Sequence, residues 1–255
     1  MLLGVSRHQL QHYPESRFGG YTDIDGTVVF FTRLRSLLTP DSVVLNLGCG
    51  RGAHEDDACK TRRELQQLRG DVKTVLGIDV DPAAETNPQV DEFRLIEGSA
   101  LPVEDASVDL ILCDMVLEHV EEPAVLLREC RRVLRPGGYF CARTPNSWSY
   151  PSWATMLIPN RYHSRVTSKV QEGRKEEDVF PTFHRCNTAG KLRRLLTGLG
   201  FDAVVYPYEA EPAYLSFSGF AYWLGVLHQR WAPRAFKPTL FAFAQLRPDG
   251  DDGVR

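Results

Sequence analysis

The sequence predicts an α/β fold whose sheet is mostly parallel and buried. Residues 43–47 form a short apolar run, rich in β-branched side chains, that suits a strand buried on both faces. Three glycines then follow at every second position, and a further apolar run, residues 74–78, ends in an acidic residue. Together, these features place a glycine loop and a carboxylate at the same edge of the sheet.

The glycine loop and the carboxylate suit a cofactor that contains a nucleoside. Gly48, Gly50 and Gly52 allow the backbone to turn sharply and to approach a ligand closely. Asp79 follows the second strand, where its carboxylate can accept hydrogen bonds from both hydroxyls of a ribose. Asp79 could instead cap the next helix, but Asp81 precedes a proline and fits that role better.

The other elements follow from periodicity and from capping signals. In chain order we expect a helical or extended segment over 28–38, a helix that begins at the acidic run 55–57 and ends at Gly70, a strand over 108–114, a helix over 126–135, a strand from 136, a helix from Thr188 to Leu199 closed by Gly200, and strands over 203–208 and 240–246.

Residues 43–146 resemble the class I S-adenosylmethionine-dependent methyltransferases that act on small molecules, and residues 183–246 do so more loosely. The resemblance depends on Leu47-Gly48-Cys49-Gly50-Arg51-Gly52, Asp79, Leu101-Pro102, Asp114, Leu117-Glu118-His119 and Leu134-Arg135-Pro136-Gly137-Gly138, in that order. It implies a Rossmann-like, mostly parallel seven-stranded sheet with helices on both faces and an antiparallel last strand, together with an insertion or lid.

Length and composition agree with one such domain. A chain of 255 residues with 43% hydrophobic residues can bury a single large core. We expect one methyltransferase domain over 1–255, divided into an arm and helix (1–40), a cofactor-binding half (41–147), an insertion or lid (148–183), a C-terminal half (184–247) and a tail (248–255).

The resemblance implies S-adenosylmethionine as the cofactor and assigns its binding to twelve residues. These are Asn46, Gly48, Cys49, Gly50, Gly52, Asp79, Val80, Ser99, Ala100, Leu101, Asp114 and Met115. Many relatives carry a carboxylate at the positions of Asn46 and Ser99. The two residues here can still form hydrogen bonds but carry no charge, which implies weaker or water-mediated contacts.

Two histidines are candidates for a general base. His119 lies at the expected cofactor edge, and His184 immediately precedes the late helix. Either could also be structural. Asp114, Glu118 and His119 together make a divalent metal conceivable. We predict none, because a metal site built from protein ligands alone needs more preorganised partners than this spacing provides.

Net charge and cysteine content indicate which partners and which redox compartment to expect. The net charge of −3 argues against nucleic acid as a partner. Six cysteines without a Cys-x-x-Cys pair predict buried thiols in a reducing cytosol, and we recognise no signal peptide. The run Asp23-Ile24-Asp25-Gly26-Thr27 is a textual match to the nucleophile loop of haloacid-dehalogenase-type phosphatases. It lacks the apolar strand that must precede it, so we expect a turn.

Two segments outside the common core are expected to determine specificity. Residues 148–183 combine aromatic and basic side chains and predict either a solvated lid or a cover over the acceptor; the basic residues are Arg161, Arg165, Lys169, Arg174 and Lys175. Residues 213–229 are apolar and uncharged but marginal in length for spanning a bilayer. With Arg230, Trp231 and Arg234 beside them, they predict either a core or homodimer contact, or a membrane-surface or lipid-acceptor contact.

The favoured function is therefore methyl transfer, and we expect the target to be oxygen of a small-molecule, sugar or lipid-linked acceptor in secondary-metabolite or glycan biosynthesis. The location would be the cytoplasm, with peripheral membrane contact through 213–231 as an option. An NAD(P)-dependent oxidoreductase is the enzyme alternative, but the third glycine lies outside the dinucleotide position. The departures at Asn46 and Ser99 motivate a third hypothesis, a non-catalytic cofactor-binding or scaffold protein.

Overall fold

A seven-stranded sheet forms the centre of the protein. The computed structural model describes residues 4–157 and 181–248. The strands lie in the order β3-β2-β1-β4-β5-β7-β6. Their bounds are β1 Val43–Leu47, β2 Thr74–Asp79, β3 Glu92–Leu95, β4 Val108–Asp114, β5 Leu134–Pro145, β6 Phe201–Tyr208 and β7 Thr239–Leu246. β1 to β5 are parallel, and β7 runs antiparallel to β5 and β6, which confirms the predicted architecture.

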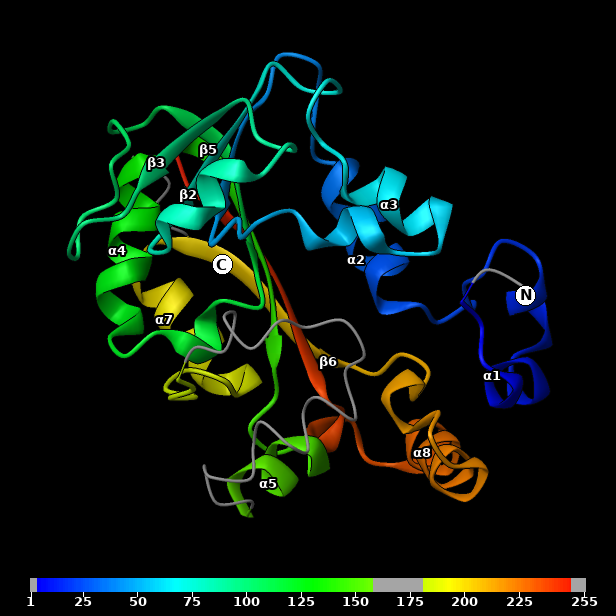
Figure 1. Ribbon diagram of the computed structural model, residues 1–255. Helices are drawn as coiled ribbons and strands as arrows, with labels where there is room; N and C mark the ends of the chain where they lie inside the picture. Colours follow the sequence, from blue (N-terminus) through cyan, green and yellow to red (C-terminus); the bar gives the residue numbers. More distant parts are fainter. Residues whose placement is uncertain (1–3, 158–180, 249–255) are drawn as a thin grey trace.

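Helices cover both faces of this sheet, as the resemblance implies. Figure 1 shows α4 and α7 on one side and α2 and α3 on the other. The helices are α1 Arg7–His12, α2 Gly26–Arg35, α3 Lys60–Gln66, α4 Pro123–Val133, α5 Tyr150–Leu157, α7 Ala189–Gly198 and α8 Gly219–Trp231. Short 3₁₀ turns include η2 Ala53–Asp56, η3 Pro82–Thr86 and η4 Leu117–His119. Among the described residues, no helix has the length and hydrophobicity needed to cross a bilayer.

The apolar strands are buried on both faces because two core clusters lie on opposite sides of the sheet. Leu45 and Ile111 pack into one cluster with Leu127 of α4, whereas their neighbours Val44 and Leu110 pack into the other, beside α2. A strand whose successive side chains enter two cores needs a continuous apolar run rather than alternation. All six cysteines are unpaired and buried.

The helix after the glycine loop differs from the prediction. The acidic run 55–57 does not begin a helix: its first two residues lie in η2, and α3 starts at Lys60. Asp57 instead accepts a hydrogen bond from the Cys59 nitrogen at 2.8 Å and pairs with Arg62 at 2.7 Å. α3 also ends at Gln66, before Gly70. A local turn and an ion pair therefore replace the expected helix start.

The other capping predictions agree better with the structure. The Thr188 side chain accepts a hydrogen bond from the Lys191 nitrogen at the start of α7, as expected. Asp25 accepts bonds from the nitrogens of Thr27 and Val28, so the phosphatase-like run is the turn that starts α2. Of the expected insertion, residues 158–180, with all five basic residues named above, lie outside the described residues.

Candidate active site

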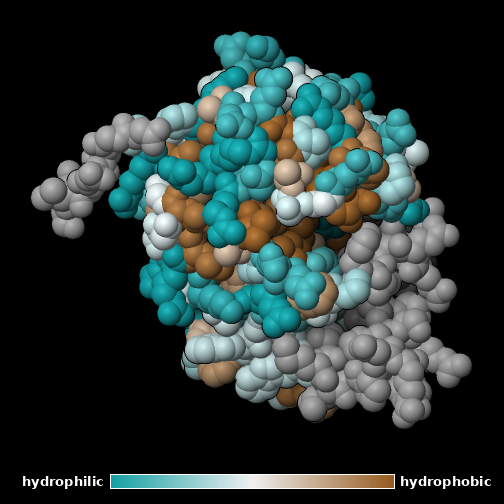
Figure 2. All heavy atoms as spheres, turned by 90° about the vertical axis from the view of Figure 1, so that its left-hand side faces the viewer, coloured by the Kyte–Doolittle hydropathy of each residue, from teal (hydrophilic) through white to brown (hydrophobic). Residues whose placement is uncertain are grey.

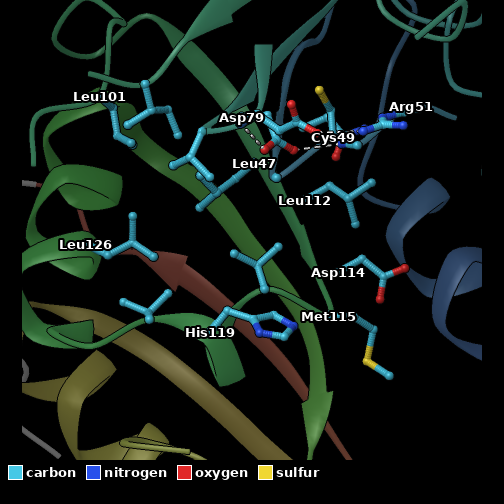
Figure 3. A pocket seen from close by; sticks show the side chains of 18 of the residues that line it. Leu47, Cys49, Arg51, Asp79, Leu101, Leu112, Asp114, Met115, His119 and Leu126 are labelled. Atoms are coloured by element: carbon cyan, nitrogen blue, oxygen red, sulfur yellow. Dashed lines mark hydrogen bonds and ion pairs between the residues drawn. The ribbon is translucent and has the colours of Figure 1, made fainter. Parts of the chain in front are cut away.

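A cavity of about 660 Å³ opens at the carboxyl ends of β1, β2 and β4. Figure 3 shows Asp79 and Cys49 at one end of this pocket and Met115 and His119 at the other. Eleven of the twelve predicted cofactor-binding residues line it: Asn46, Gly48, Cys49, Gly50, Gly52, Asp79, Val80, Ser99, Leu101, Asp114 and Met115. Ala100 is not among the lining residues. On the face that Figure 2 presents, apolar side chains gather around a hollow rimmed by hydrophilic ones.

Asp79 links the glycine loop to the segment after β2. Its Oδ2 accepts a hydrogen bond from the Gly50 nitrogen and its Oδ1 accepts one from the Asp81 nitrogen, both at 2.9 Å. Each carboxylate oxygen can accept a second hydrogen bond, so the group keeps capacity for a ligand hydroxyl. Asp81 accepts a bond from the Ala83 nitrogen at the start of η3, the capping role expected of it.

The glycine loop has a backbone that other residues would not adopt readily. Gly48 has φ of +69°, and a Cβ there would lie 2.4 Å from a methyl carbon of Val116. Gly50 has φ of +54° with open space beside it. A left-handed backbone next to free volume allows a ligand to approach the peptide groups closely.

Asn87 holds the glycine loop in place through hydrogen bonds to its backbone, and the sequence did not indicate this role. Its Nδ2 donates to the carbonyl oxygens of Cys49 at 2.8 Å and Gly50 at 3.1 Å. The side chain is buried, and a Cβ on Gly52 would lie 2.8 Å from its Oδ1. Because this clamp joins residues far apart in the chain, no local pattern indicated it.

An ion pair on α4 holds the loop that carries Ser99 and Leu101. The Leu101 nitrogen donates to Glu129 Oε2 at 2.9 Å, and Arg132 donates to the carbonyls of Leu101 and Val103. Hydrogen bonding to Arg132 also holds the pKa of the Glu129 carboxyl below its usual value. The spacing of Glu129 and Arg132 is that of a helical pair, which sequence reasoning could have found.

At the other end of the cavity, Asp114 is neutralised by Arg143. The guanidinium donates from Nε and Nη2 to the two carboxylate oxygens at 2.7 and 2.6 Å, and from Nη1 to Thr27 Oγ1 at 2.9 Å. It also lies 5.1 Å from the ring centroid of Phe30. This bidentate pair fixes the strand end from which Met115 projects. Met115 has φ of +57°, a strained conformation for a residue with a side chain.

His119 lines the cavity near Met115. Its Nδ1 lies 2.8 Å from the Pro181 carbonyl oxygen, which can only accept, so Nδ1 must carry the proton. In the neutral ring, Nε2 is then the nitrogen without a proton, and it lies 4.0 Å from Glu118 Oε1. His119 therefore has the tautomer that a general base requires.

His184 and Glu118 lie behind His119 rather than in the cavity lining. Burial, and the nearby His119, lower the pKa of His184. Burial raises the pKa of Glu118, whose Oε2 accepts from Thr144 Oγ1 at 2.9 Å. Among the described residues, no group of three His, Cys, Asp or Glu side chains could hold a metal ion.

His54 is a lining residue that sequence reasoning missed. Burial lowers its pKa despite the opposing charge of Asp114. Its Nε2 is buried and has no hydrogen-bond partner within the described part of the chain. The position immediately after the glycine loop was visible in the sequence, but its burial depends on tertiary packing.

Comparisons with known proteins agree with this geometry. Residues 45–142 match the methyltransferase-11 family, described as a methyltransferase domain. A probable S-adenosylmethionine-dependent methyltransferase of Mycolicibacterium smegmatis is 34% identical over 160 residues, which cover 57% of each chain. A ubiquinone biosynthesis O-methyltransferase of Acinetobacter baumannii is 25% identical over 180 residues, covering 66% of this chain and 71% of the relative.

The structural comparison extends over more of the chain. An S-adenosylmethionine-dependent methyltransferase from Mesorhizobium loti superposes with a TM-score of 0.53 at 20% identity, covering 87% of this chain and 99% of the other. This similarity shows the fold. The chain spans about half the length of the first curated relatives that it matches.

Residues 45–142 form a class I S-adenosylmethionine-dependent methyltransferase domain of the methyltransferase-11 type. Relatives that match this domain are named as dependent on S-adenosylmethionine as cofactor. The cavity fits this cofactor: Asp79 keeps hydrogen-bonding capacity, Gly50 leaves room at the backbone, and Val80 presents an apolar side chain that is 59% exposed. These findings favour this class over the nicotinamide-dependent alternative.

Proposed function

We propose that the protein transfers a methyl group from S-adenosylmethionine to a hydroxyl oxygen of a small-molecule, sugar or lipid-linked acceptor. The observation that carries the proposal is a second cavity, of about 480 Å³, that shares Met115 with the cofactor cavity. Two adjoining cavities can hold two reactants next to each other, and alignment of reactants alone can supply roughly 7–11 kcal/mol of the barrier.

The second cavity has a polar, acidic lining. Its charged residues are Asp25, Asp57, Arg62, Arg143 and Glu211. Three of these residues carry carboxylates and two carry guanidiniums, so the carboxylates are in excess. Arg62 pairs with Asp25 and Asp57, and Arg143 pairs with Asp114. A negative wall disfavours anionic groups and offers acceptors for hydroxyl protons. The second cavity therefore suits the hydroxyl-bearing part of a neutral acceptor. If the acceptor is linked to a lipid through an anionic group, that group would remain outside the cavity.

Glu211 is suited to contact the acceptor. Its Oε2 accepts a bond from Thr22 Oγ1 at 2.8 Å. Burial, and secondarily the charge of Asp25, raise the pKa of its carboxyl. Its carboxylate oxygens can accept a further hydrogen bond from a hydroxyl of the acceptor.

The chain's own part in the reaction would be binding, orientation and proton removal. S-adenosylmethionine supplies the activated methyl group. Asp79 and the glycine loop would hold the cofactor, Met115 would separate the two ligands, and His119 Nε2 would accept the proton from the acceptor hydroxyl. General-base assistance of this kind typically contributes about 10²–10⁴-fold.

The test uses S-adenosylmethionine labelled in its methyl group and solvent-partitioned extracts as the source of acceptor. We expect label in an extractable product, with hydriodic acid releasing it as methyl iodide, the behaviour of an O-methyl group. Label that stays bound to carbon after this treatment would contradict oxygen as the target. Cofactor binding without any transfer would support the scaffold alternative instead.

A matched pair of variants tests the assignment of the second cavity. Glu211→Gln should raise the KM for the acceptor about tenfold, as expected when a hydrogen bond from the acceptor to a charged group becomes one to a neutral amide, with little change in the KM for the cofactor. Glu85→Gln changes an exposed carboxylate elsewhere and is the control. Equal acceptor KM values in the two variants would place the acceptor outside this cavity.

A further inference from the structure

One end of the molecule presents a cluster of exposed aromatic and aliphatic side chains, which we call the aromatic end. It consists of Phe217, Phe220, Trp223, Leu224 and Trp231 on or next to α8, with Trp153 and Phe236 beside them. Figure 1 shows α5 and α8 at the same end. Ring contacts join α5 to α8 and to the turn after it. The ring centroids of Tyr150 and His228 lie 4.6 Å apart, and those of Trp153 and Phe236 lie 6.4 Å apart.

Three of the four tryptophans of the chain, Trp153, Trp223 and Trp231, lie in the aromatic end, and all three are exposed. Exposure is largest at Trp231, 81%, and at Phe220, 69%. Large aromatic side chains are normally buried, and a contiguous exposed group of them marks an interaction surface.

The outward face of α8 is exposed although the helix itself is firmly packed against the protein. Its inner face is buried through Tyr222 and Val226, which pack with Tyr13 and Ile24 of the N-terminal arm. Glu209, itself buried, pairs with His228 at 2.8 Å and with Lys237 at 3.0 Å. α8 is therefore anchored on one side and presents apolar side chains on the other.

The exposed charges on α8 and in the turn after it are positive. Residues 212–247 contain no Asp or Glu, and their cations are Arg230, Arg234, Lys237 and Arg247. Arg230 and Arg234 flank Trp231 and are exposed, whereas Lys237 bonds inward to backbone carbonyls and Glu209. A second copy of this surface would bring like charges together, but an anionic lipid surface would complement them.

We propose that the aromatic end binds the surface of an anionic lipid bilayer. α8 would lie in the membrane plane with Phe220, Leu224 and Trp231 at the boundary between headgroups and acyl chains, the position that aromatic side chains prefer. Arg230 and Arg234 would contact lipid phosphates. This binding requires no methyl transfer, so it stands or falls separately from the proposed function.

Vesicle flotation tests the proposal with the full chain. Vesicles are made of phosphatidylcholine alone or of phosphatidylcholine and phosphatidylserine in equal amounts. We expect co-flotation with the anionic vesicles, a decrease as salt rises, and little binding to the neutral ones. Absence of flotation with anionic vesicles at low salt would overturn the proposal.

Matched variants locate the binding surface. Phe220→Ser combined with Leu224→Ser should weaken vesicle binding about tenfold or more, because two apolar side chains no longer leave water. Val204→Ser changes an apolar residue that is also exposed, at 61%, but lies on β6, and should bind like the wild type. Binding of S-adenosylmethionine by calorimetry should be the same in all three proteins, which shows that the variants fold.

A second copy of the chain is the competing occupant of the aromatic end. Sedimentation of the wild type and the Phe220→Ser, Leu224→Ser variant distinguishes the two. A monomer in both cases supports lipid as the partner. A wild-type dimer that the double substitution disperses, without vesicle binding, would overturn the proposal in favour of a subunit interface.

Discussion

The carboxylate of Asp79 accepts a hydrogen bond from the backbone nitrogen of Gly50, 29 residues earlier in the chain, at 2.9 Å. Its second oxygen accepts one from the Asp81 nitrogen. The ends of β1 and β2 are therefore joined by the same side chain that we expect to hold the ribose. Cofactor binding and order in the glycine loop should depend on this one group.

Asp79→Asn should weaken S-adenosylmethionine binding about tenfold or more. Charge-assisted hydrogen bonds contribute about 1.5–3 kcal/mol each, and the amide Nδ2 would face a backbone N–H that needs an acceptor. Isothermal calorimetry measures the effect. Asp71→Asn, which changes an exposed carboxylate paired with Arg35, is the control and should bind normally. Tight NAD binding with no heat from S-adenosylmethionine would refute the cofactor assignment.

His119→Ala should lower turnover about 10²-fold and leave cofactor affinity nearly unchanged if His119 is the general base. His184→Ala should have a smaller effect, because His184 does not line the cavity. Single-turnover kinetics with saturating acceptor measure both. Unchanged turnover in both variants would show that alignment of the reactants carries the reaction without a base.

Met115→Gly should be more stable than Met115→Ala by about 1 kcal/mol. A left-handed conformation costs a residue with a side chain about 1–2 kcal/mol, and the greater freedom of glycine in the unfolded chain offsets part of the gain. Comparing the two variants removes the contribution of the methionine side chain. Urea unfolding measures the difference, and equal midpoints would show that the backbone at position 115 is not strained.

The protein should lose stability on acidification below about pH 6.5. Burial lowers the pKa of His54 and His184 in the folded state. A group whose folded pKa is lowered contributes stability above its unfolded pKa, and this contribution is lost as pH falls through the folded value. His54→Gln should flatten the decrease in the urea midpoint between about pH 7 and pH 5. An identical decrease in wild type and variant would contradict the burial of a neutral His54.

Local sequence patterns predicted the helices and strands whose formation depends mainly on residues close together in the chain. β1, β2 and β4 are continuous apolar runs, and the start of α7 at Thr188 depends on a side chain and a nitrogen three residues apart. Eleven of the predicted cofactor residues also line one cavity, because the carboxyl ends of parallel strands meet at the same edge.

Contacts between distant residues account for what the sequence did not show. Asn87 reaches back 38 residues to the carbonyl of Cys49. The acidic run 55–57 looked like a helix start, but Asp57 uses its carboxylate for a turn and for Arg62. Likewise, helical spacing in 213–231 puts Phe220 and Tyr222 on opposite faces, but only the packing shows that Tyr222 is buried and Phe220 exposed. Each outcome depends on which elements pack together.

Because its six thiols are buried, the folded protein should react slowly with thiol reagents. Burial raises the pKa of Cys49 to about 12 and that of Cys186 to about 11, so little reactive thiolate forms at neutral pH. Cys113, Cys130 and Cys186 lie in the core on one face of the sheet and Cys141 lies in the core on the other, whereas Cys49 lines the cofactor cavity. Pulsed alkylation read by mass spectrometry would therefore report separately how often each half of the interior opens, with no engineered probe.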